Sequence, residues 1–349
     1  MSGRFLALDA GNSKTVAVVV DGDGAALGRG RGGRGDIYNA PTPDHAAQAV
    51  LSAARAALAE AGASPGELDA AAFRLAGVDW PEDAPWWRDR IEAGLAGLSR
   101  FSVANDGFAS LRLGALDGVG LAITIGTGPA IAARSREGRE ACSGWWVFDN
   151  LGGWGLAEGA IRATCLAWMG LAEPTVLADA LCRLFDVPDP YALRHQLTRR
   201  DRKLPADAEL RATRTVLDVA RSGDPVASRL VAEQAAAFAR YAGWVAEQVG
   251  ARPGPDLPVV LNGPIATSEN PVPREALLSS PPGFIRASCG AAIMFIVAGV
   301  SGTCSVTASA AASSSSSEAA CRALPNGSFF SMSWKTTLMP SSSARMPIC

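Results

Sequence analysis

The hydrophobic pattern in the first part of the chain alternates between short apolar runs and longer amphipathic stretches. Residues 6–21 have the pattern of an apolar strand, a tight turn and a second apolar strand, and a third strand is expected at 25–30. A helix is expected from about Pro43, because Thr42 can cap its first turn and proline fits the first helical position. Its apolar residues recur at helical spacing up to Gly62, where we expect the helix to end.

Strands then alternate with helices, and polar residues follow the ends of the strands. Strands are expected at 69–76 and 101–104, and helices at 86–98 and 108–116. An open α/β sheet collects such polar residues along the carboxyl ends of its strands. We therefore expect a functional site at that edge of the sheet.

The pattern restarts after this point, which predicts a second domain. The segment Leu-Ala-Ile-Thr-Ile-Gly at 121–126 aligns without gaps with Leu-Ala-Leu-Asp-Ala-Gly at 6–11, at a spacing of 115 residues. Asp9 of the first copy is replaced by Thr124 in the second. Two similar hairpins, only one of which carries a carboxylate, suggest a nucleotide gripped from both sides with its Mg²⁺ on the Asp9 side.

The remainder of the chain changes character twice. It becomes mostly helical, and a clear strand follows a proline-rich linker at 257–262. We expect an N-terminal domain over 1–116 and a C-terminal domain with a helical insertion over 117–280. From there on the chain has few charges, many serines and four of the seven cysteines. We interpret 281–349 as an atypical low-complexity tail that is either frameshifted or disordered.

The bulk composition excludes several classes of function. A length of 349 residues gives room for two domains, and a net charge of −2 gives no reason to expect a nucleic acid or a membrane as partner. The cysteines contain no Cys-x-x-Cys pair, and two histidines leave little room for a His-based metal site or a Ser-His-Asp hydrolase. Without a signal peptide or a membrane-length apolar stretch, we expect a cytoplasmic protein with reduced thiols.

The turn after the first strand combines small residues, hydroxyl groups and a lysine with one carboxylate. Successive backbone N–H groups in such a turn can bind an anion. Asp9 at its mouth is out of place beside a phosphate unless a cation lies between them, which indicates a Mg-nucleotide site. For Gly11 and Asn12, an ordinary hairpin turn is the alternative interpretation.

These motifs together resemble the BadF/BadG/BcrA/BcrD ATPase-type family, which includes the N-acetylglucosamine kinases. The motifs are Asp9-Ala-Gly-Asn-Ser-Lys-Thr15, Asn105-Asp106, Gly126-Thr-Gly128 and Leu261-Asn-Gly263, and the resemblance covers roughly residues 4–280. It implies an α/β fold of duplicated ribonuclease-H-like (actin-like ATPase) domains with a central nucleotide cleft. It also implies an ATP-dependent kinase that transfers the γ-phosphoryl group to a hydroxyl of a sugar or amino sugar.

The resemblance also implies roles for individual residues. Asp9 would hold Mg²⁺, usually through water, and Asp106 would be the catalytic base that accepts the hydroxyl proton. For Asp106, an N-cap of the following helix is a second, compatible interpretation. The residues implied to bind ATP are Gly11, Asn12, Ser13, Lys14, Thr15, Gly126, Thr127, Gly128 and Gly263. The residues implied to contact the sugar are Asn39, Gly77, Asp79, Trp145 and Asp149.

The sequence departs from the family at two places, which keeps alternatives open. Phe148-Asp-Asn-Leu-Gly-Gly153 stands where the sugar kinases carry Gly-Asp-Glu-Gly-Ser-Gly, so the identity of the sugar is left open. The closing helix of the family is not recognisable after residue 280. One alternative is a BadF-type ATPase that activates a partner enzyme, although the cysteines show no iron–sulfur motif. Another is a catalytically impaired ATP- or sugar-binding protein. A homodimer is also left open.

Overall fold

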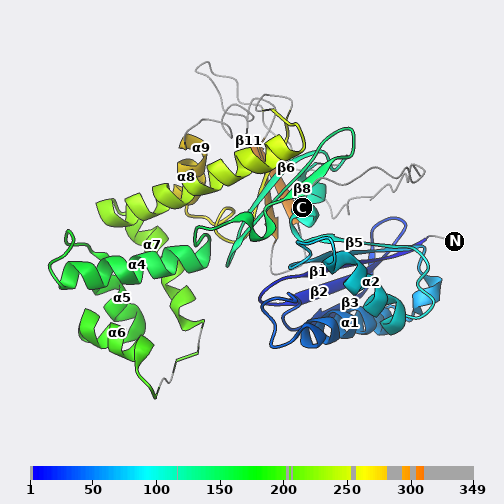
Figure 1. The fold of residues 1–349 in the computed structure, drawn as a ribbon, viewed down its shortest axis with the longest axis horizontal. Coiled ribbons are helices and arrows are strands. Elements are labelled where there is room, and N and C mark those ends of the chain that lie inside the picture. Colours follow the sequence, from blue (N-terminus) through cyan, green and yellow to red (C-terminus); the bar gives the residue numbers. More distant parts are fainter. Residues whose placement is uncertain are drawn as a thin grey trace, which may run out of the picture. The chain divides into compact units, whose positions relative to one another are not determined.

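The computed structural model divides the chain into two compact units, of which the first extends to Ala109 and the second begins at Ser110. The described residues are 3–115, 117–201, 204–205, 207–252 and 257–280, together with the backbone of 293–298 and 304–309. Apart from those two backbone segments, the predicted tail over 281–349 lies outside the described residues. Each unit contains one mixed β-sheet (Figure 1).

The first sheet has the strand order β3-β2-β1-β4-β5. Strand β1 pairs antiparallel with β2 and parallel with β4, which in turn pairs parallel with β5. The strands are β1 (Arg4–Ala10), β2 (Thr15–Asp21), β3 (Ala26–Gly32), β4 (Ala70–Leu75) and β5 (Phe101–Asn105). The parallel strands therefore end at the same edge, as the polar residues after them predicted.

Helix α1 (Pro43–Glu60) lies along the strands β1 to β3 (Figure 1). The helix begins where the sequence predicted. The Thr42 side chain caps its first turn by accepting a hydrogen bond from the backbone N of His45 at 3.3 Å. Past its end, Gly62 has the left-handed φ of +58° that favours glycine in a terminating residue.

The Arg-Gly run of β3 is the surface on which α1 packs. A Cβ atom at Gly28 would lie 2.3 Å from the carbonyl oxygen of Ala57, and one at Gly30 would lie 1.9 Å from that of Ala53. Only glycine allows the helix backbone to approach the strand this closely. The glycines therefore alternate along the strand because one of its faces is covered by alanines spaced four apart on the helix.

Helices α2 (Asp83–Gly94) and α3 (Gly107–Gly114) follow β4 and β5. Helix α2 begins and ends a few residues earlier than predicted. Its Trp87 and Ile91 are fully buried, and the side chain of Leu51 from α1 packs so closely on Gly94 that a Cβ there would lie 2.6 Å from it. Helices α1 and α2 are therefore neighbours on one face of the first sheet.

The sheet of the second unit has the order β11-β10-β9-β6-β7-β8. Strand β6 pairs antiparallel with β7 and parallel with β9, and β9 pairs parallel with β10. This repeats the arrangement of β1 with β2 and β4. The strands are β6 (Gly120–Ile125), β7 (Pro129–Arg134), β8 (Glu140–Cys142), β9 (Val259–Asn262), β10 (Ile293–Ala298) and β11 (Cys304–Ser309).

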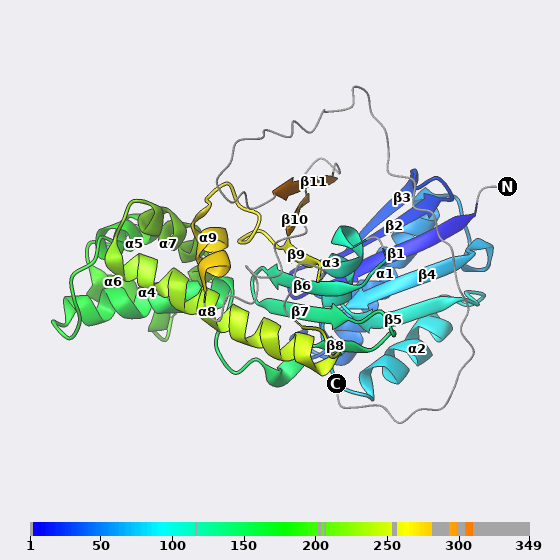
Figure 2. The same ribbon diagram turned by 90° about the horizontal axis from the view of Figure 1, so that it is seen from above.

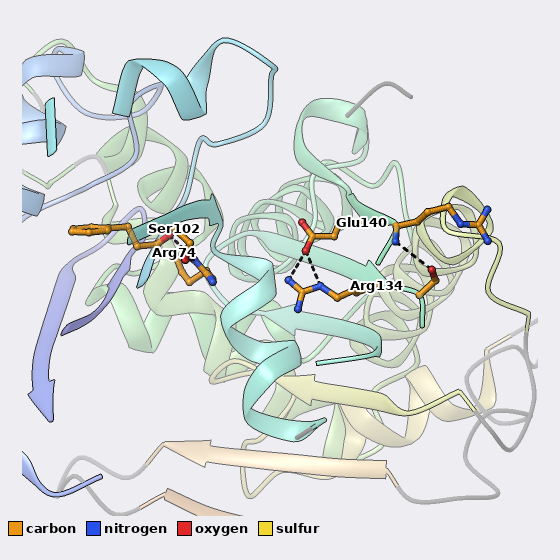
Figure 3. A network of polar contacts seen from close by, with 7 residues as sticks. Arg74, Ser102, Arg134 and Glu140 are labelled. Carbon is orange, nitrogen blue, oxygen red and sulfur yellow. Dashed lines mark hydrogen bonds and ion pairs between the residues drawn. The ribbon is translucent and has the colours of Figure 1, made fainter. Parts of the chain in front are cut away.

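Polar pairs connect neighbouring strands in each sheet, as Figure 3 shows. Arg74 on β4 donates to the hydroxyl of Ser102 on β5 at 3.2 Å. Arg134 on β7 donates through Nε to Glu140 on β8 at 2.7 Å, and these two residues are also paired in the strand register. Such cross-strand pairs stabilise a sheet locally and specify its register.

The helices of the second unit pack against one another, and the long helix α8 extends from this group to β7 and β8 (Figure 2). They are α4 (Gly153–Trp168), α5 (Leu177–Phe185), α6 (Pro190–Thr198), α7 (Ala212–Arg221), α8 (Pro225–Gln248) and α9 (Val272–Ser279). Short 3₁₀ turns occur at Pro65–Glu67, Gly144–Trp146 and Ala208–Arg211. Within the described part of the chain, every helix is too short or too polar to cross a membrane.

Candidate functional site

The turn between β1 and β2 places Asp9 at the edge of the first sheet. Leu8 and Ala10 are buried on the α1 side, whereas Asp9 between them is exposed on the other face. The backbone N of Gly11 donates to the carbonyl of Lys14 at 3.0 Å, which closes the turn. The carboxyl group of Asp9 is thus accessible at the mouth of a tight turn.

The side chains of this turn divide into supporting and accessible groups. Thr15 is fully buried, and its hydroxyl donates to the carbonyl of Gly33 at 2.9 Å, so that it supports the turn from inside. Asn12, Ser13 and Lys14 are exposed. Surrounding protein atoms desolvate Asp9 and raise its pKa, while the nearby charge of Lys14 acts in the opposite direction.

Two loops of the first unit bring together three residues predicted to contact the sugar. After this prediction, which the structure does not test, we call residues 36–39 sugar loop 1 and residues 77–80 sugar loop 2. Gly77 has a φ of +77°, and a Cβ there would lie 2.8 Å from a carboxylate oxygen of Asp36. Asn39 donates to the other oxygen of Asp36 at 2.7 Å. The two loops are therefore in contact.

Asp36 is a site residue that the sequence analysis missed. It is only 4% exposed, and besides Asn39 it accepts a hydrogen bond from the backbone N of Tyr38 at 2.9 Å. In the sequence, Asp36 follows an Arg-Gly run whose glycines allow α1 to pack on β3. Only its position after a strand could have identified it as a candidate site residue. Its contacts with Asn39 and Gly77, and the effect of its charge on the pKa of Asp106, make it a candidate site residue.

Asp106 follows β5 and lies among other carboxylates of the first unit. Desolvation, followed by the negative charges of Asp9, Asp79 and Asp36, raises the pKa of Asp106 to about 8, although a hydrogen bond from the backbone of Gly107 opposes this. Near neutral pH the group therefore binds a proton more readily than an ordinary aspartate. This is a property expected of a residue that exchanges protons.

The end of β5 is also tied to sugar loop 2. Asn105 donates through Nδ2 to Asp79 at 2.8 Å and accepts through Oδ1 from the backbone N of Gly107 at 2.9 Å. The residues on either side of Asp106 are thus fixed by one amide side chain. The structure brings together the first-unit candidates Asp9, Asn39, Gly77, Asp79 and Asp106 at one edge of the sheet.

The turn between β6 and β7 is built against the start of α4. The carbonyl of Gly126 accepts a hydrogen bond from the backbone N of Gly153 at 2.9 Å, and that of Thr127 accepts from Trp154 at 3.1 Å. A helix leaves its first N–H groups without an intrahelical partner, and here the turn satisfies two of them. The turn residues 126–128 are therefore held by their carbonyl groups.

Glycine residues allow the turn after β6 to lie close to the start of α4. A glycine also allows the end of β6 to lie close to the residue that follows β9. Gly152 has a φ of +78°, and a Cβ there would lie 2.8 Å from the carbonyl oxygen of Gly126. Gly263 has a φ of +91°, and a Cβ there would lie 2.5 Å from the carbonyl oxygen of Ile125. Both glycines permit close backbone approach beside the predicted phosphate-binding turn.

The strand ends of the second unit carry neutral polar groups. The hydroxyls of Thr124 and Ser110 are 2.8 Å apart, and Asn262 donates to Ser110 at 2.7 Å. Thr124 therefore takes part in a local hydrogen-bond network, at the strand position that Asp9 occupies in the first unit. None of these three side chains is ionisable, in contrast to Asp9.

Trp145 and Asp149 also lie in the second unit, after β8. Trp145 is 49% exposed. The carboxylate of Asp149 accepts a hydrogen bond from Tyr241 at 2.8 Å and lies 3.5 Å from Arg240, both on α8. Asp149 thus fastens its loop to α8 within the second unit.

The chain is similar to a protein with a curated activity, although no protein-family model matches it. It is 27% identical over 233 residues to an N-acetylmuramic acid/N-acetylglucosamine kinase from Clostridium acetobutylicum. The match covers 66% of this chain and 75% of that protein.

Solved structures show the fold. A protein from Chromobacterium violaceum, described only as a candidate N-acetylglucosamine kinase, matches with a TM-score of 0.60 and 26% identity, over 82% of this chain and 93% of that one. A glucokinase of the ROK family from Streptomyces griseus, solved with glucose and AMPPNP, matches with a TM-score of 0.52 and 19% identity, over 81% and 90%. With the repeated sheet order, they confirm the predicted α/β fold of duplicated, ribonuclease-H-like (actin-like ATPase) domains.

Proposed function

We propose that the chain is an ATP-dependent kinase that phosphorylates a hydroxyl of a sugar or amino sugar resembling N-acetylglucosamine. The observation that carries the proposal is the position of Asp106, which is near both the Asp9 turn and sugar loop 2 in the first unit. The similar proteins named above are sugar kinases, which supports this reaction class. We further propose that the chain belongs to the BadF/BadG/BcrA/BcrD family, whose motifs it carries.

Asp106 would act as the base for the sugar hydroxyl. Phosphoryl transfer requires in-line positioning, neutralisation of charge and an acceptor for the hydroxyl proton. A pKa of about 8 means that the carboxylate, once ionised, holds a proton more strongly than an ordinary aspartate does. Asn39, Gly77 and Asp79 would orient the sugar toward it, and Trp145 and Asp149 are the proposed sugar contacts of the second unit.

Mg²⁺ fits the Asp9 turn when the ATP phosphates supply its other ligands. In the described part of the chain, no three His, Cys, Asp or Glu side chains converge to hold a metal by themselves. Magnesium is usually bound by one or two carboxylates together with phosphates and water, so the exposed carboxylate of Asp9 suffices. Bound there, the ion would neutralise charge on the transferring phosphoryl group.

ATP would be bound by the backbone of both repeated turns. Gly11, Asn12, Ser13 and Lys14 would surround the β- and γ-phosphates, with Lys14 adding a positive charge. Thr15, which the sequence also assigned to ATP binding, is fully buried and bonded to Gly33, so it would support the turn and not contact the phosphates. In the second unit, Gly126, Thr127 and Gly128 would supply the other phosphate contact, and Gly263 would lie against the adenosine. The fixed carbonyl groups of the 126–128 turn support this proposal, because they keep the turn rigid.

A BadF-type activator of a partner enzyme is a weaker proposal. It would require accessible thiolates for an iron–sulfur cluster. Of the three described cysteines, Cys142 and Cys182 are buried, and burial raises the pKa of Cys165 and of Cys182. These are properties of structural cysteines.

The experiment that tests the kinase proposal is ADP release from Mg-ATP across a panel of sugars and amino sugars. Asp106→Asn should lower turnover by about 10²-fold or more, because the amide cannot accept the proton. Thermal stabilisation by Mg-ATP should persist in this variant. Asp89→Asn, which alters an exposed aspartate of α2, is the matched control and should keep full turnover.

Three results would overturn parts of the proposal. Unchanged turnover in Asp106→Asn would exclude this residue as the base. Stabilisation of the wild type by Mg-ATP without ADP release on any sugar would favour an impaired binding protein. The absence of both effects would contradict ATP binding itself.

A further inference from the structure

The two sugar loops are fastened to one buried carboxylate that the proposed chemistry does not use. Asp83, the first residue of α2, is only 3% exposed. Its Oδ1 accepts a hydrogen bond from the hydroxyl of Tyr38 in sugar loop 1 at 2.7 Å. Its Oδ2 accepts from the backbone N of Asp79 at 2.9 Å and from that of Trp80 at 2.6 Å, both in sugar loop 2.

An ionised carboxylate suits these three donors better than any other side chain. It offers two oxygens and accepts hydrogen bonds only, so that Tyr38 and the two backbone N–H groups can all donate to it. Hydrogen bonds to an ionised acceptor are also stronger than those between neutral groups. An asparagine in place of Asp83 would turn its NH₂ group, which cannot accept these hydrogen bonds, either toward the Tyr38 hydroxyl or toward the two backbone N–H groups.

The connection extends from sugar loop 2 to the proposed base. The side chain of Asp79 accepts from Asn105, which also accepts from the backbone of Gly107, so Asp106 lies between two fixed residues. The contact of Gly77 with Asp36 presses the two loops together at their other end. Asp83 is therefore the point from which both loops and the end of β5 are held in one arrangement.

We propose that Asp83 is a positioning residue that holds both sugar loops in register and thereby sets the fit of the sugar against Asp106. This inference rests on the proposed function for its consequence in catalysis. Its structural part, the joint fastening of the two loops, rests only on the hydrogen bonds of Asp83. Misplacement of a substrate by about 1 Å can cost about 10²-fold in rate.

Hydrogen exchange and kinetics on three variants of the full chain test the proposal. In Asp83→Asn, amide exchange should become at least tenfold faster in both loops, at residues 36–39 and 77–80. In Tyr38→Phe, which removes one donor and keeps the ring, exchange should rise in sugar loop 1 alone. Asp89→Asn on the exposed side of the same helix is the control and should leave both loops unchanged.

The kinetic measurement separates positioning from a general loss of structure. In Asp83→Asn the KM for the sugar should rise by about tenfold or more, while the KM for ATP stays within about twofold of the wild type. A general loss of structure would move both constants. Tyr38→Phe should give a smaller rise in the sugar KM, and it keeps the test open if Asp83→Asn does not fold.

The two parts of the proposal fail in different ways. Wild-type exchange in both loops of Asp83→Asn would overturn the fastening, as would faster exchange in sugar loop 2 of Tyr38→Phe. Faster exchange with an unchanged sugar KM would overturn the positioning role. If the wild type phosphorylates no sugar, the proposed function fails, whereas the exchange experiment still decides whether Asp83 joins the loops.

Discussion

The turns after β1 and β6 occupy the same place in two sheets of the same order, yet their chemistry differs. The first is surrounded by carboxylates, of which Asp9, Asp36 and Asp79 all raise the pKa of Asp106. The second has Thr124 and Asn262 near the equivalent strand ends, and both bond to the hydroxyl of Ser110 on α3. The comparison teaches that a duplicated fold can keep one backbone design for binding and place ionisable groups in one copy only.

The rigidity of the two turns also has different sources. In the first unit, side chains fasten the surrounding loops, with Asp36 and Asp83 as the main acceptors. In the second unit, the backbone does so, because the start of α4 donates to the carbonyls of Gly126 and Thr127. Substitution of Asp36 or Asp83 should therefore loosen the loops of the first unit, and substitution of Gly152 should loosen the turn after β6.

The largest expected effect comes from making the first turn resemble the second. Asp9→Thr should lower kcat/KM for ATP by about 10²-fold or more, because a bound Mg²⁺ would lose its protein carboxylate. The measurement is turnover as a function of Mg²⁺ concentration. A variant that keeps the Mg²⁺ dependence of the wild type would remove Asp9 from the metal site.

The charge of the first unit should appear in the pH dependence. The raised pKa of Asp106 means that the free protein holds its base ionised only above about pH 8, so kcat/KM should fall about tenfold per pH unit below that value. Asp79→Asn removes a neighbouring negative charge and should shift this fall to lower pH. A pH profile identical in the two proteins would contradict the electrostatic coupling.

The rigidity of the second turn can be tested at Gly152. Gly152→Ala should destabilise the protein by about 1–3 kcal/mol, because its left-handed φ of +78° is strained for alanine and its Cβ would meet the carbonyl of Gly126. The KM for ATP should rise with it. Urea denaturation and steady-state kinetics measure the two effects.

A matched glycine on α8 provides the control for this experiment. A Cβ atom at Gly243 would meet nothing within 4 Å, and the residue lies inside the helix. Gly243→Ala should therefore stabilise the protein by about 0.5–1 kcal/mol and leave the KM for ATP unchanged. Equal effects at Gly152 and Gly243 would show that the contact with the turn is unimportant.

The smallest expected effect is at the counterpart of Asp9. Thr124→Val should lower the free energy of unfolding by about 1 kcal/mol, because the hydrogen bond with Ser110 is lost. Turnover should change by less than about threefold, since Asn262 still donates to Ser110. A loss of activity comparable to that of Asp9→Thr would show that the two turns are chemically equivalent.

The strands of the first unit and most of its helix positions could be predicted from the sequence because they depend on local patterns, whereas the strand order became known only from the structure. The repeat of residues 6–11 at 121–126 predicted a second, related domain, and Thr42 with Pro43 predicted the start of α1. Asp9 and Asp106 were recognisable because each directly follows or ends an apolar strand. Such signals act within a few residues and need no knowledge of distant contacts.

Other parts of the site depended on residues far apart in the chain. Asp83 gave no signal, because its partner Tyr38 lies 45 residues away in another loop. Asp36 bonds to Tyr38 and Asn39 in its own loop, but its contact with Gly77 is visible only in the folded chain. The third strand was expected at 25–30, whereas β3 extends to Gly32 and its glycines pack against α1.

The sequence by itself therefore determined the elements, their repetition and the residues expected to carry the reaction, since apolar periodicity and turn chemistry are local. Only the tertiary structure decided which acceptor fastens the sugar loops and how far the pKa of Asp106 is raised. Hydrogen bonding at fixed distance and electrostatic coupling both depend on positions in space. In this chain, folding places the loop that contains Asp36 against the segment that contains Asp79 and Asp83.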